Sequence, residues 1–334
     1  MRLHLNENTA GCSPAVIDTI RRLGRSDVGL YPDYEAAQQA VAGLFGVPVD
    51  HLLLTNGMDE GILAAAAAAC RDHSNGVPEA VGVAPAFDEY EICTTAVGGR
   101  MVTVRLEDEG FELSAPDIRA AVTPRTRIVF VTNPHNPSGR TVPLETLRAL
   151  ARDVAPAVLF VDEAYADFSG ETLIDPATLA AFPNVVVGRT FSKAYGLAGL
   201  RAGVLVALPA TLAPLRRVVP PYSVNAWAAA ALPVAIADRA YRDWYLEQAA
   251  ASRTLLTDAC ARLELRTWPS AANFVLVRVD NAAAVVGGLA ARGVRVRDRS
   301  ADPGCRQCIR ITAGLVEDTR RAIAALEEVV CAAP

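Results

Sequence analysis

The chain has 334 residues, of which 51% are hydrophobic, and its formal net charge is -5 at pH 7. This length corresponds to one or two globular domains with ample core, and an acidic balance without blocks of Lys or Arg gives no electrostatic surface for nucleic acid. No apolar run reaches the ~18 residues of a membrane span, residues 1–9 lack the apolar core of a signal peptide, and seven Cys, an odd number, favour the cytoplasm over a disulfide framework.

From about residue 52 to 207, short apolar runs alternate with helix-like stretches. This pattern predicts a mostly parallel sheet with helices on both faces. Most of the expected strands are rich in Val and Ile without alternation, as in strands that are buried on both faces. The expected strands are residues 52–55, 80–84, 101–104, 128–132, 158–162, 185–188 and 203–206. The expected helices between them are residues 60–70, 87–97, 115–121 and 144–155.

Beyond residue 209 the pattern changes. Two consecutive prolines at 220 and 221 interrupt the chain, and a long Ala-rich helical stretch follows to about residue 263. We then expect strands at 266–268, 274–278, 294–297 and 308–312, with helices at 282–292 and 316–330. The fold class is therefore α/β, with a large, mostly parallel sheet domain and a smaller α+β C-terminal domain. The expected division is 1–25 for an N-terminal segment that packs with the small domain, 26–212 for the large domain and 213–334 for the small domain.

The basic residues are strongly biased: 31 of the 32 are Arg, and the single Lys is Lys193. An average composition would supply on the order of twenty lysines. A primary amine can lose its proton and form an imine, which a guanidinium cannot do. Lys193 is therefore a candidate for a position that requires an amine, with chance survival of one surface Lys as the alternative at this point.

The residues around Lys193 suggest a phosphate ester next to an aldehyde. Thr190 and Ser192 precede the lysine and Arg201 follows it by eight residues, so two hydroxyls and a guanidinium accompany one amine. Such groups bind a phosphorylated aldehyde that is held as an imine. Glycines 196, 199 and 203 resemble a dinucleotide fingerprint only superficially, because no GxGxxG follows the first strand. We interpret them as tight-packing glycines.

Two further polar groups come at the ends of buried strands. Asp162 and Tyr165 follow the apolar run 158–161, and Asn136 lies in a sharp turn after the run 128–132. Ligands of open α/β sheets gather at the carboxyl ends of strands. Asp162 is suited to keep a pyridine nitrogen protonated, Tyr165 to donate to a ring phenolate, and the Asn136 amide to reach the same oxygen. We interpret the neighbouring His135 as a turn residue without a ligand role.

These motifs together resemble one family. The chain is similar to fold-type I pyridoxal-phosphate enzymes, and most closely to the histidinol-phosphate aminotransferase family. Each motif alone is weak, but their order and spacing are specific. The matching segments are residues 6–8 (NEN), 31–33 (YPD), 56–60 (NGMDE), 85–90 (PAFDEY), 133–139 (NPHNPSG), 162–165 (DEAY), 190–201, 220–225 (PPYSVN), 272–274 (ANF), 296–298 (VRD) and 308–312 (CIRIT).

The resemblance implies roles for the cofactor-binding residues. Lys193 would form the imine with pyridoxal 5'-phosphate, and Asp162 would pair with the pyridine nitrogen. Asn136 and Tyr165 would hold the phenolic oxygen, and Tyr90 would stack on the ring, with Phe87 as the rival for that position. The phosphate would be bound by Thr190, Ser192, Arg201 and the backbone N–H groups of Gly57, Met58 and Asp59, which open a helix after a strand. Tyr31 would reach the phosphate of the other subunit, which requires a homodimer.

The resemblance also implies a substrate end. Arg310 would clamp the α-carboxylate, Arg297 would lie at the distal end of the substrate, and Asn8 and Asn136 would contact the substrate as well. Arg295, Arg297 and Arg299 alternate on an expected strand and so share a face, which is either an anion pocket or a solvated edge. We give the pocket slight preference for Arg297.

The resemblance implies an aminotransferase that moves an amino group between an amino acid or amino alcohol phosphate and a 2-oxo acid, with Lys193 as the base. The alternatives on this scaffold are a pyridoxal-phosphate decarboxylase, an oxidase or a specialised-metabolism aminotransferase. A sensor domain of a transcription regulator is disfavoured because the chain has no room for a DNA-binding module, and a nicotinamide dehydrogenase by the missing fingerprint. The CxxC at residues 305–308 lacks a second ligand pair, so we expect no metal.

Overall fold

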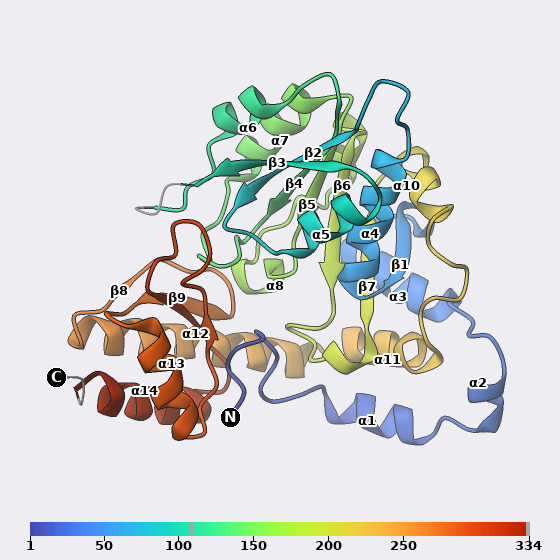
Figure 1. The fold of residues 1–334 in the computed structure, drawn as a ribbon. Helices are drawn as coiled ribbons and strands as arrows, with labels where there is room; N and C mark the ends of the chain where they lie inside the picture. Colours follow the sequence, from blue (N-terminus) through green and yellow to red (C-terminus); the bar gives the residue numbers. More distant parts are fainter. Residues whose placement is uncertain (107–109, 332–334) are drawn as a thin grey trace.

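The computed structural model describes residues 1–106 and 110–331. Its larger sheet has seven strands in the order β1-β7-β6-β5-β4-β2-β3 (Figure 1). Strand β7 runs antiparallel to both of its neighbours, and the other pairs are parallel. This confirms the expected mostly parallel sheet. The strands are β1 (Leu52–Asn56), β2 (Glu79–Ala84), β3 (Arg100–Arg105), β4 (Thr126–Thr132), β5 (Val158–Asp162), β6 (Val185–Thr190) and β7 (Ala202–Val206).

Helices cover both faces of this sheet. Successive strand residues point to opposite faces, so they contact different helices. Ile128 and Phe130 of β4 pack with α4, α5 and α10, whereas Val129 and Val131 pack with α6, α7 and α9. Both faces are apolar, which explains why the strands read as continuous hydrophobic runs. The helices are α4 (Gly57–Cys70), α5 (Glu89–Ala96), α6 (Ala115–Ala121), α7 (Leu144–Val154), α8 (Ala166–Ser169), α9 (Pro176–Ala181) and α10 (Pro209–Arg216), and short 3-10 turns lie at Val49–His51 and Ala198–Leu200.

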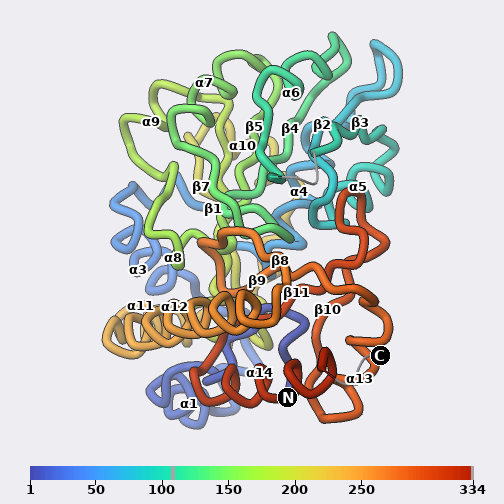
Figure 2. Tube along the Cα trace, turned by 90° about the vertical axis from the view of Figure 1, so that its left-hand side faces the viewer, coloured from blue at the N-terminus to red at the C-terminus, as the bar shows by residue number. Residues whose placement is uncertain are grey.

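The C-terminal part forms a separate four-stranded antiparallel sheet in the order β10-β11-β9-β8, with its own apolar core. Leu3, near the N-terminus, is buried in that core. The strands are β8 (Arg266–Thr267), β9 (Phe274–Arg278), β10 (Arg297–Asp298) and β11 (Cys308–Thr312), and the helices are α12 (Arg239–Arg262), α13 (Ala282–Ala291) and α14 (Val316–Cys331). Figure 2 shows α12 running along the small sheet, below the larger one.

The Ala-rich helical stretch that was expected up to about residue 263 consists of two helices, α11 (Ala226–Ala237) and α12. They separate at Asp238, whose side chain accepts a hydrogen bond from the N–H of Tyr241 and so caps α12. Three N-terminal helices, α1 (Pro14–Arg21), α2 (Arg25–Gly29) and α3 (Glu35–Phe45), were not predicted. Helices α1 and α3 contact α11, and Ala228 and Leu232 of α11 belong to the core of the larger sheet. Among the described residues, no helix is both long and apolar enough to cross a membrane.

Candidate active site

A cavity of about 490 Å³ lies between the larger sheet, the small domain and the N-terminal segment. It opens at the carboxyl ends of β4, β5 and β6, where ligands of α/β sheets bind. Most of the residues that the sequence singled out line this one space, although they come from distant parts of the chain. The lining includes Met58, Asp59, Asn136, Asp162, Tyr165, Thr190, Ser192, Lys193, Arg201, Arg297 and Arg310.

Lys193 follows β6 and its side chain lies in the cavity. Its Nζ donates a hydrogen bond to the carbonyl oxygen of Leu5 at 3.0 Å, and it lies 6.0 Å from the ring centroid of Tyr165. The amine makes no ion pair among the described residues. Lys193 is therefore placed to react with a carbonyl group that enters the cavity, and chance survival as a surface residue no longer accounts for it.

Asp162 ends β5 and is 4% exposed. Its Oδ2 accepts a hydrogen bond from the hydroxyl of Tyr90 at 2.6 Å, and its Oδ1 accepts one from the N–H of Ala164 at 3.0 Å. Burial raises the pKa of Asp162, while these hydrogen bonds and the nearby Lys193 oppose the rise. A buried carboxylate with lone pairs to spare can hold a cationic N–H donor within the cavity.

Tyr90 does not take the expected place on the cavity wall, whereas Phe87 does. Tyr90 lies in the first turn of α5, its ring stacks on Phe130 at a centroid distance of 4.9 Å, and its hydroxyl is 2.8 Å from Thr132 Oγ1. The Tyr90 hydroxyl thus bonds two residues that line the cavity, Asp162 and Thr132, while Tyr90 itself is not part of the lining. The structure thus favours Phe87, the rival, for contact with a ring.

Asn136 and Tyr165 face the cavity from the segments that follow β4 and β5. Asn136 Oδ1 accepts a hydrogen bond from Arg310 Nη1, and the Tyr165 hydroxyl accepts one from Asn6 Nδ2 at 2.9 Å. The neighbouring His135 is fully buried, with its ring nitrogens 2.8 Å from Ser138 Oγ and from the carbonyl oxygen of Pro85. Burial lowers the pKa of His135 to about 4, so it is a neutral residue of the turn.

The start of α4 forms the end of the cavity that suits an anion. Asn56, at the N-cap, makes no side-chain hydrogen bond to the first turn, so the N–H groups of Gly57, Met58 and Asp59 are not capped. Gly57 has φ +78°, and a Cβ there would lie 2.3 Å from Arg201 Nη2. Arg201 Nη2 pairs with Asp59 Oδ2 at 2.8 Å. Uncapped N–H groups beside a guanidinium and the hydroxyls of Thr190 and Ser192 form a typical phosphate site.

The glycines after Lys193 were interpreted as tight-packing residues, which is right for two of the three. A Cβ at Gly203 would lie 2.7 Å from the backbone of Gly57, and one at Gly196 would lie 2.2 Å from the carbonyl oxygen of Gly11. Gly199 has open space around it, so packing does not explain that glycine.

Three guanidinium groups line the opposite end of the cavity: Arg297 and Arg310 on neighbouring strands, and Arg299 just after β10. Arg310 is 6% exposed, and burial together with Arg299 and Arg297 lowers its pKa to about 10. Arg299 pairs with Asp302 and donates to the carbonyl oxygen of Ala86 at 3.2 Å. The shared strand face of Arg297 and Arg299 is therefore a pocket wall. The alternation of arginines in the sequence pointed to Arg299 as well, but only Arg297 was predicted as a site residue.

Asn8 and Tyr31 were expected in the site but, like Gly57 and Tyr90, do not line the cavity of this chain. Asn8 Nδ2 donates to the carbonyl oxygen of Ala194 at 3.0 Å, so it braces the loop next to Lys193. Tyr31 is 77% exposed and stacks on Tyr222 at a centroid distance of 4.2 Å. Contact between Tyr31 and a cavity therefore requires a second chain.

His4, Leu5 and Glu7 of the N-terminal segment also line the cavity, and the sequence gave no signal for them beyond the motif at residues 6–8. Arg310 Nη2 donates to the carbonyl oxygen of His4 at 3.0 Å. The segment thus contacts both Lys193 and Arg310. Within residues 1–106 and 110–331, no group of three His, Cys, Asp or Glu side chains is arranged to hold a metal ion.

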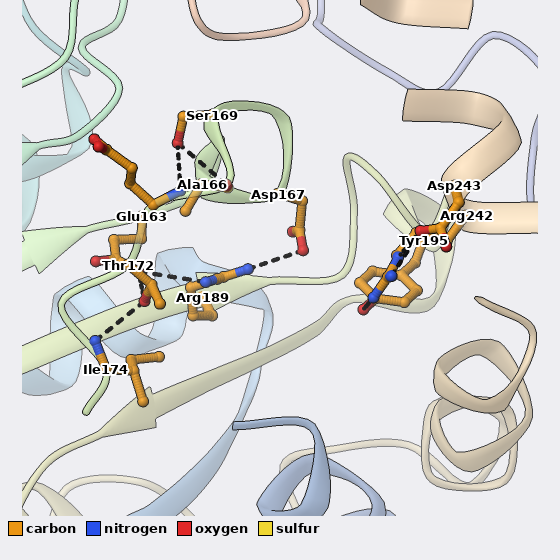
Figure 3. Close-up of polar contacts among 11 residues, drawn as sticks. Glu163, Ala166, Asp167, Ser169, Thr172, Ile174, Arg189, Tyr195, Arg242 and Asp243 are labelled. Carbon is orange, nitrogen blue, oxygen red and sulfur yellow. Dashed lines mark hydrogen bonds and ion pairs between the residues drawn. The ribbon is translucent and has the colours of Figure 1, made fainter. Parts of the chain in front are cut away.

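A buried ionic network supports the sheet behind the site. Arg189, next to Thr190, pairs with Asp167 Oδ1 at 2.9 Å and with Glu163 Oε2 at 3.3 Å (Figure 3). Because neighbouring strand residues point to opposite faces, this network lies on the face away from the cavity. Glu163 Oε1 also accepts the N–H of Leu173 at 2.6 Å. The network joins the ends of β5 and β6 to the segment around α8.

Comparisons with known proteins agree with this geometry. The family model "Aminotransferase class I and II" matches residues 1–326. The chain is 39% identical to histidinol-phosphate aminotransferase 2 of Ralstonia nicotianae, over 100% of this chain and 89% of that protein. It is 37% identical to histidinol-phosphate aminotransferase 1 of Cupriavidus pinatubonensis, over 98% and 87%.

The chain belongs to the class I and II aminotransferases, in the histidinol-phosphate aminotransferase family. A solved relative supports the same conclusion. The structure of histidinol-phosphate aminotransferase from Sinorhizobium meliloti, in complex with pyridoxal-5'-phosphate, matches with a TM-score of 0.87 at 28% identity, over 99% of this chain and 90% of that one. The family, fold class and enzyme class expected from the sequence are thereby confirmed, and so is pyridoxal 5'-phosphate as the cofactor of this aminotransferase.

Proposed function

We propose that this aminotransferase binds pyridoxal 5'-phosphate through Lys193 and moves the amino group of a phosphorylated donor, of the histidinol phosphate type, to a 2-oxo acid. The observation that carries the proposal is the arrangement of one cavity. The single lysine lies between an uncapped helix start and three guanidinium groups. A phosphorylated cofactor fits the first end and an anionic substrate fits the second.

The described residues fit the cofactor group by group. The first turn of α4, Thr190, Ser192 and Arg201 would hold the phosphate. Asp162, buried and already accepting two hydrogen bonds, would pair with the pyridine nitrogen. Tyr165 and Asn136 would hold the phenolic oxygen. When bound, the cofactor supplies an electron sink for the α-carbon of the donor.

The protein's own groups then move the protons. Lys193 is the amine in the cavity, so with the donor bound in its place on the cofactor, Lys193 would take the proton from the α-carbon of the donor and return it to the aldehyde carbon of the cofactor. Asp162 keeps the pyridine nitrogen protonated, because a buried carboxylate favours a neighbouring positive charge. Arg310, clamped between Asn136 and His4, orients the donor. Transamination, decarboxylation and oxidation differ in which bond is cleaved, and the family assignment favours transamination.

The charge of the cavity supports an anionic donor. Arg297, Arg299 and Arg310 gather in one wall, and Asp302 pairs with Arg299. The remaining positive charge attracts a negatively charged substrate, which the names of the relatives also suggest. Arg297 would bind the distal anion, and Asn8 would act on the substrate indirectly through the Ala194 loop.

A chemical trapping experiment tests the proposal. We expect borohydride treatment of the loaded protein to fix a pyridoxyl group on Lys193, which mass spectrometry reads without ambiguity because the chain has one lysine. Histidinol phosphate, aromatic amino acids and basic amino acids are then added singly without oxygen. Conversion to the pyridoxamine spectrum identifies the donor. An unmodified Lys193 would refute the proposal, and release of carbon dioxide would replace transamination by decarboxylation.

We also propose that the enzyme is a homodimer in which Tyr31 reaches the phosphate of its partner. An exposed apolar surface supports it: Leu30 is 71% exposed, Tyr31 77% and Tyr222 52%. Large exposed apolar groups that cluster mark an interaction surface. All seven cysteines are free, in keeping with the proposed cytoplasmic location. The domain limits at residues 25 and 212 stay predictions.

A further inference from the structure

Asn6 is held by the small domain in an unusual backbone conformation. It is 1% exposed, and its φ of 54° lies in the left-handed region. Asn tolerates this region better than most residues. Its N–H donates to Thr312 Oγ1 at 3.1 Å, and its carbonyl oxygen accepts from Asn273 Nδ2 at 3.1 Å. The backbone of Asn6 is therefore fixed from two sides at the edge of the cavity.

The same contacts orient the side chain. Thr312 Oγ1 donates to Asn6 Oδ1 at 3.3 Å, and Asn6 Nδ2 donates to the Tyr165 hydroxyl at 2.9 Å. Because the amide oxygen faces the Thr312 hydroxyl, the amide NH₂ must face Tyr165. The direction of the bond to Tyr165 follows from the whole set of contacts and not from one distance.

This direction decides what Tyr165 can do. A phenol has one hydrogen to donate and lone pairs to accept with. The Asn6 N–H occupies a lone pair of the Tyr165 oxygen, so the hydrogen of Tyr165 must point elsewhere. Tyr165 lines the cavity, whereas Asn6 is not among the lining residues. The free hydrogen of Tyr165 is thus available to a group inside the cavity.

We propose that Asn6 is a positioning residue that keeps Tyr165 a hydrogen-bond donor toward the phenolic oxygen of the cofactor. The inference rests on the proposed function and assigns a task to the N-terminal segment. It also ties that task to β11, because Thr312 stands two residues after Arg310 on the same strand. A hydrogen bond from Tyr165 to the phenolic oxygen favours the form in which the nitrogen that joins Lys193 to the cofactor has lost its proton.

The test replaces the donor by an acceptor of the same shape. In Asn6→Asp the carboxylate accepts the hydrogen of Tyr165, which then turns away from the cavity. The absorbance of the loaded protein, titrated against pH, reports the pKa of the nitrogen joined to Lys193. We expect Asn6→Asp to raise that pKa by about one, since a hydrogen bond to a charged group has that size. Asn6→Ala, which adds no charge, should raise it by less but with the same sign.

A second background separates positioning from a direct charge effect. In Tyr165→Phe the pKa of the nitrogen joined to Lys193 should already be raised. Adding Asn6→Asp to this variant should change that pKa by less than about a third of the change that Asn6→Asp causes in the wild type. The matched control is Asn281→Asp, which keeps the cap of α13 outside the site and should change nothing. An Asn6→Asp effect of equal size in both backgrounds, or no change with either Asn6 variant, overturns the role of Asn6.

The failure of this inference can be told from failure of the proposed function. If borohydride fixes no adduct on Lys193 of the wild type, the proposed function fails and the inference fails with it. If the adduct forms in the wild type and in Asn6→Asp but the pKa values agree, only the role of Asn6 fails. Thermal unfolding of the loaded variants reports loss of fold independently of the titration.

Discussion

Lys193 shows how much a single side chain depends on its neighbours. Its amine lies in a cavity with Asp162, Tyr165 and four guanidinium groups, and it donates to Leu5 of the N-terminal segment. An Arg at this position would keep the positive charge but could not form an imine. The bias toward Arg elsewhere in the chain is consistent with a position where charge alone does not suffice.

The first prediction concerns Arg297. Replacing it with Gln removes a charge of the cavity wall that in our proposal binds the distal end of the substrate, while Arg310 stays in place. We expect kcat/KM for phosphorylated donors to fall about 10- to 150-fold, since a hydrogen bond to a charged group contributes about 1.5–3 kcal/mol. Neutral donors should lose less than about threefold. Steady-state kinetics with both kinds of donor makes the comparison.

Arg295→Gln is the matched control, because Arg295 is exposed and does not line the cavity. It should leave both kinds of donor nearly unaffected. Equal losses for phosphorylated and neutral donors in Arg297→Gln would remove Arg297 from recognition of the distal anion.

At the scale of elements, the strands of the larger sheet are joined by a buried carboxylate. Glu79 begins β2, and its side chain is fully buried. It pairs with Arg100, at the start of β3, and with Arg125, just before β4, and it accepts a hydrogen bond from Thr123. These partners outweigh burial and lower the pKa of Glu79 to about 2. One carboxylate therefore ties three strand ends together.

The second prediction is that Glu79→Gln lowers the free energy of unfolding by about 1–3 kcal/mol at pH 7. The effect is no larger because the two arginines are partly exposed, and solvent weakens their pairing with Glu79. The pKa of Glu79 is lower in the folded chain than its usual 4.5, so the stabilisation is complete above that value and is lost as the pH falls toward 2. Urea denaturation at several pH values should show the wild type and the variant converging below about pH 5.

The control for this prediction is Glu145→Gln, which removes an exposed ion pair within α7. Such a pair contributes about 0–1 kcal/mol, so the variant should unfold close to the wild type at all pH values. A Glu79→Gln difference that stays constant from pH 7 to pH 3 would show that the charge of Glu79 is not the cause.

At the scale of the whole molecule, the site is built where three parts of the chain meet. The carboxyl ends of β4, β5 and β6 provide one wall, the region of β10 and β11 provides the guanidinium groups, and residues 4–7 close the gap between them. Tyr31 lies outside this arrangement on an exposed apolar surface. A second copy of the chain is the occupant of that surface in our proposal.

The third prediction follows from shared sites. A Tyr31→Phe chain keeps Lys193, and a Lys193→Ala chain keeps Tyr31. In a mixed dimer, one site then has both residues intact. We expect a 1:1 mixture, after exchange of subunits, to reach about a quarter of the wild-type activity per chain, above the sum of the separate variants. A mixture that equals that sum would refute shared sites, and an unmixed sample of each variant serves as the control.

The sequence predicted the elements whose signal is local. The strands at 158–162, 274–278 and 308–312 have the predicted limits. Residues 158–161 and 274–277 are uninterrupted apolar runs, which mark buried strands. The helix break at Asp238 was missed because Ala-rich sequence favours helix on both sides of it. Helices α1 to α3 were missed as well, and their packing on α11 is a tertiary effect.

Much of the site was predicted from residue type and position along the chain, but its fine geometry was not. Tyr90 and Phe87 stand three residues apart in one motif, and only the packing of α5 decided that Phe87 lines the cavity while Tyr90 bonds Asp162. Arg299 was passed over because alternation on a strand does not distinguish a pocket from a solvated edge.

By itself the sequence predicted one amine and a carboxylate at the end of a buried strand, and its family resemblance implied a helix start suited to phosphate. The first two follow from residue type and from the rule that ligands of α/β sheets bind at the carboxyl ends of strands. The tertiary structure alone decided which distant groups meet. Asn6 and Thr312 are 306 residues apart in the chain, yet they contact each other and orient Tyr165. Local sequence carries no signal for such a contact, because it depends on how the small domain and the N-terminal segment pack together.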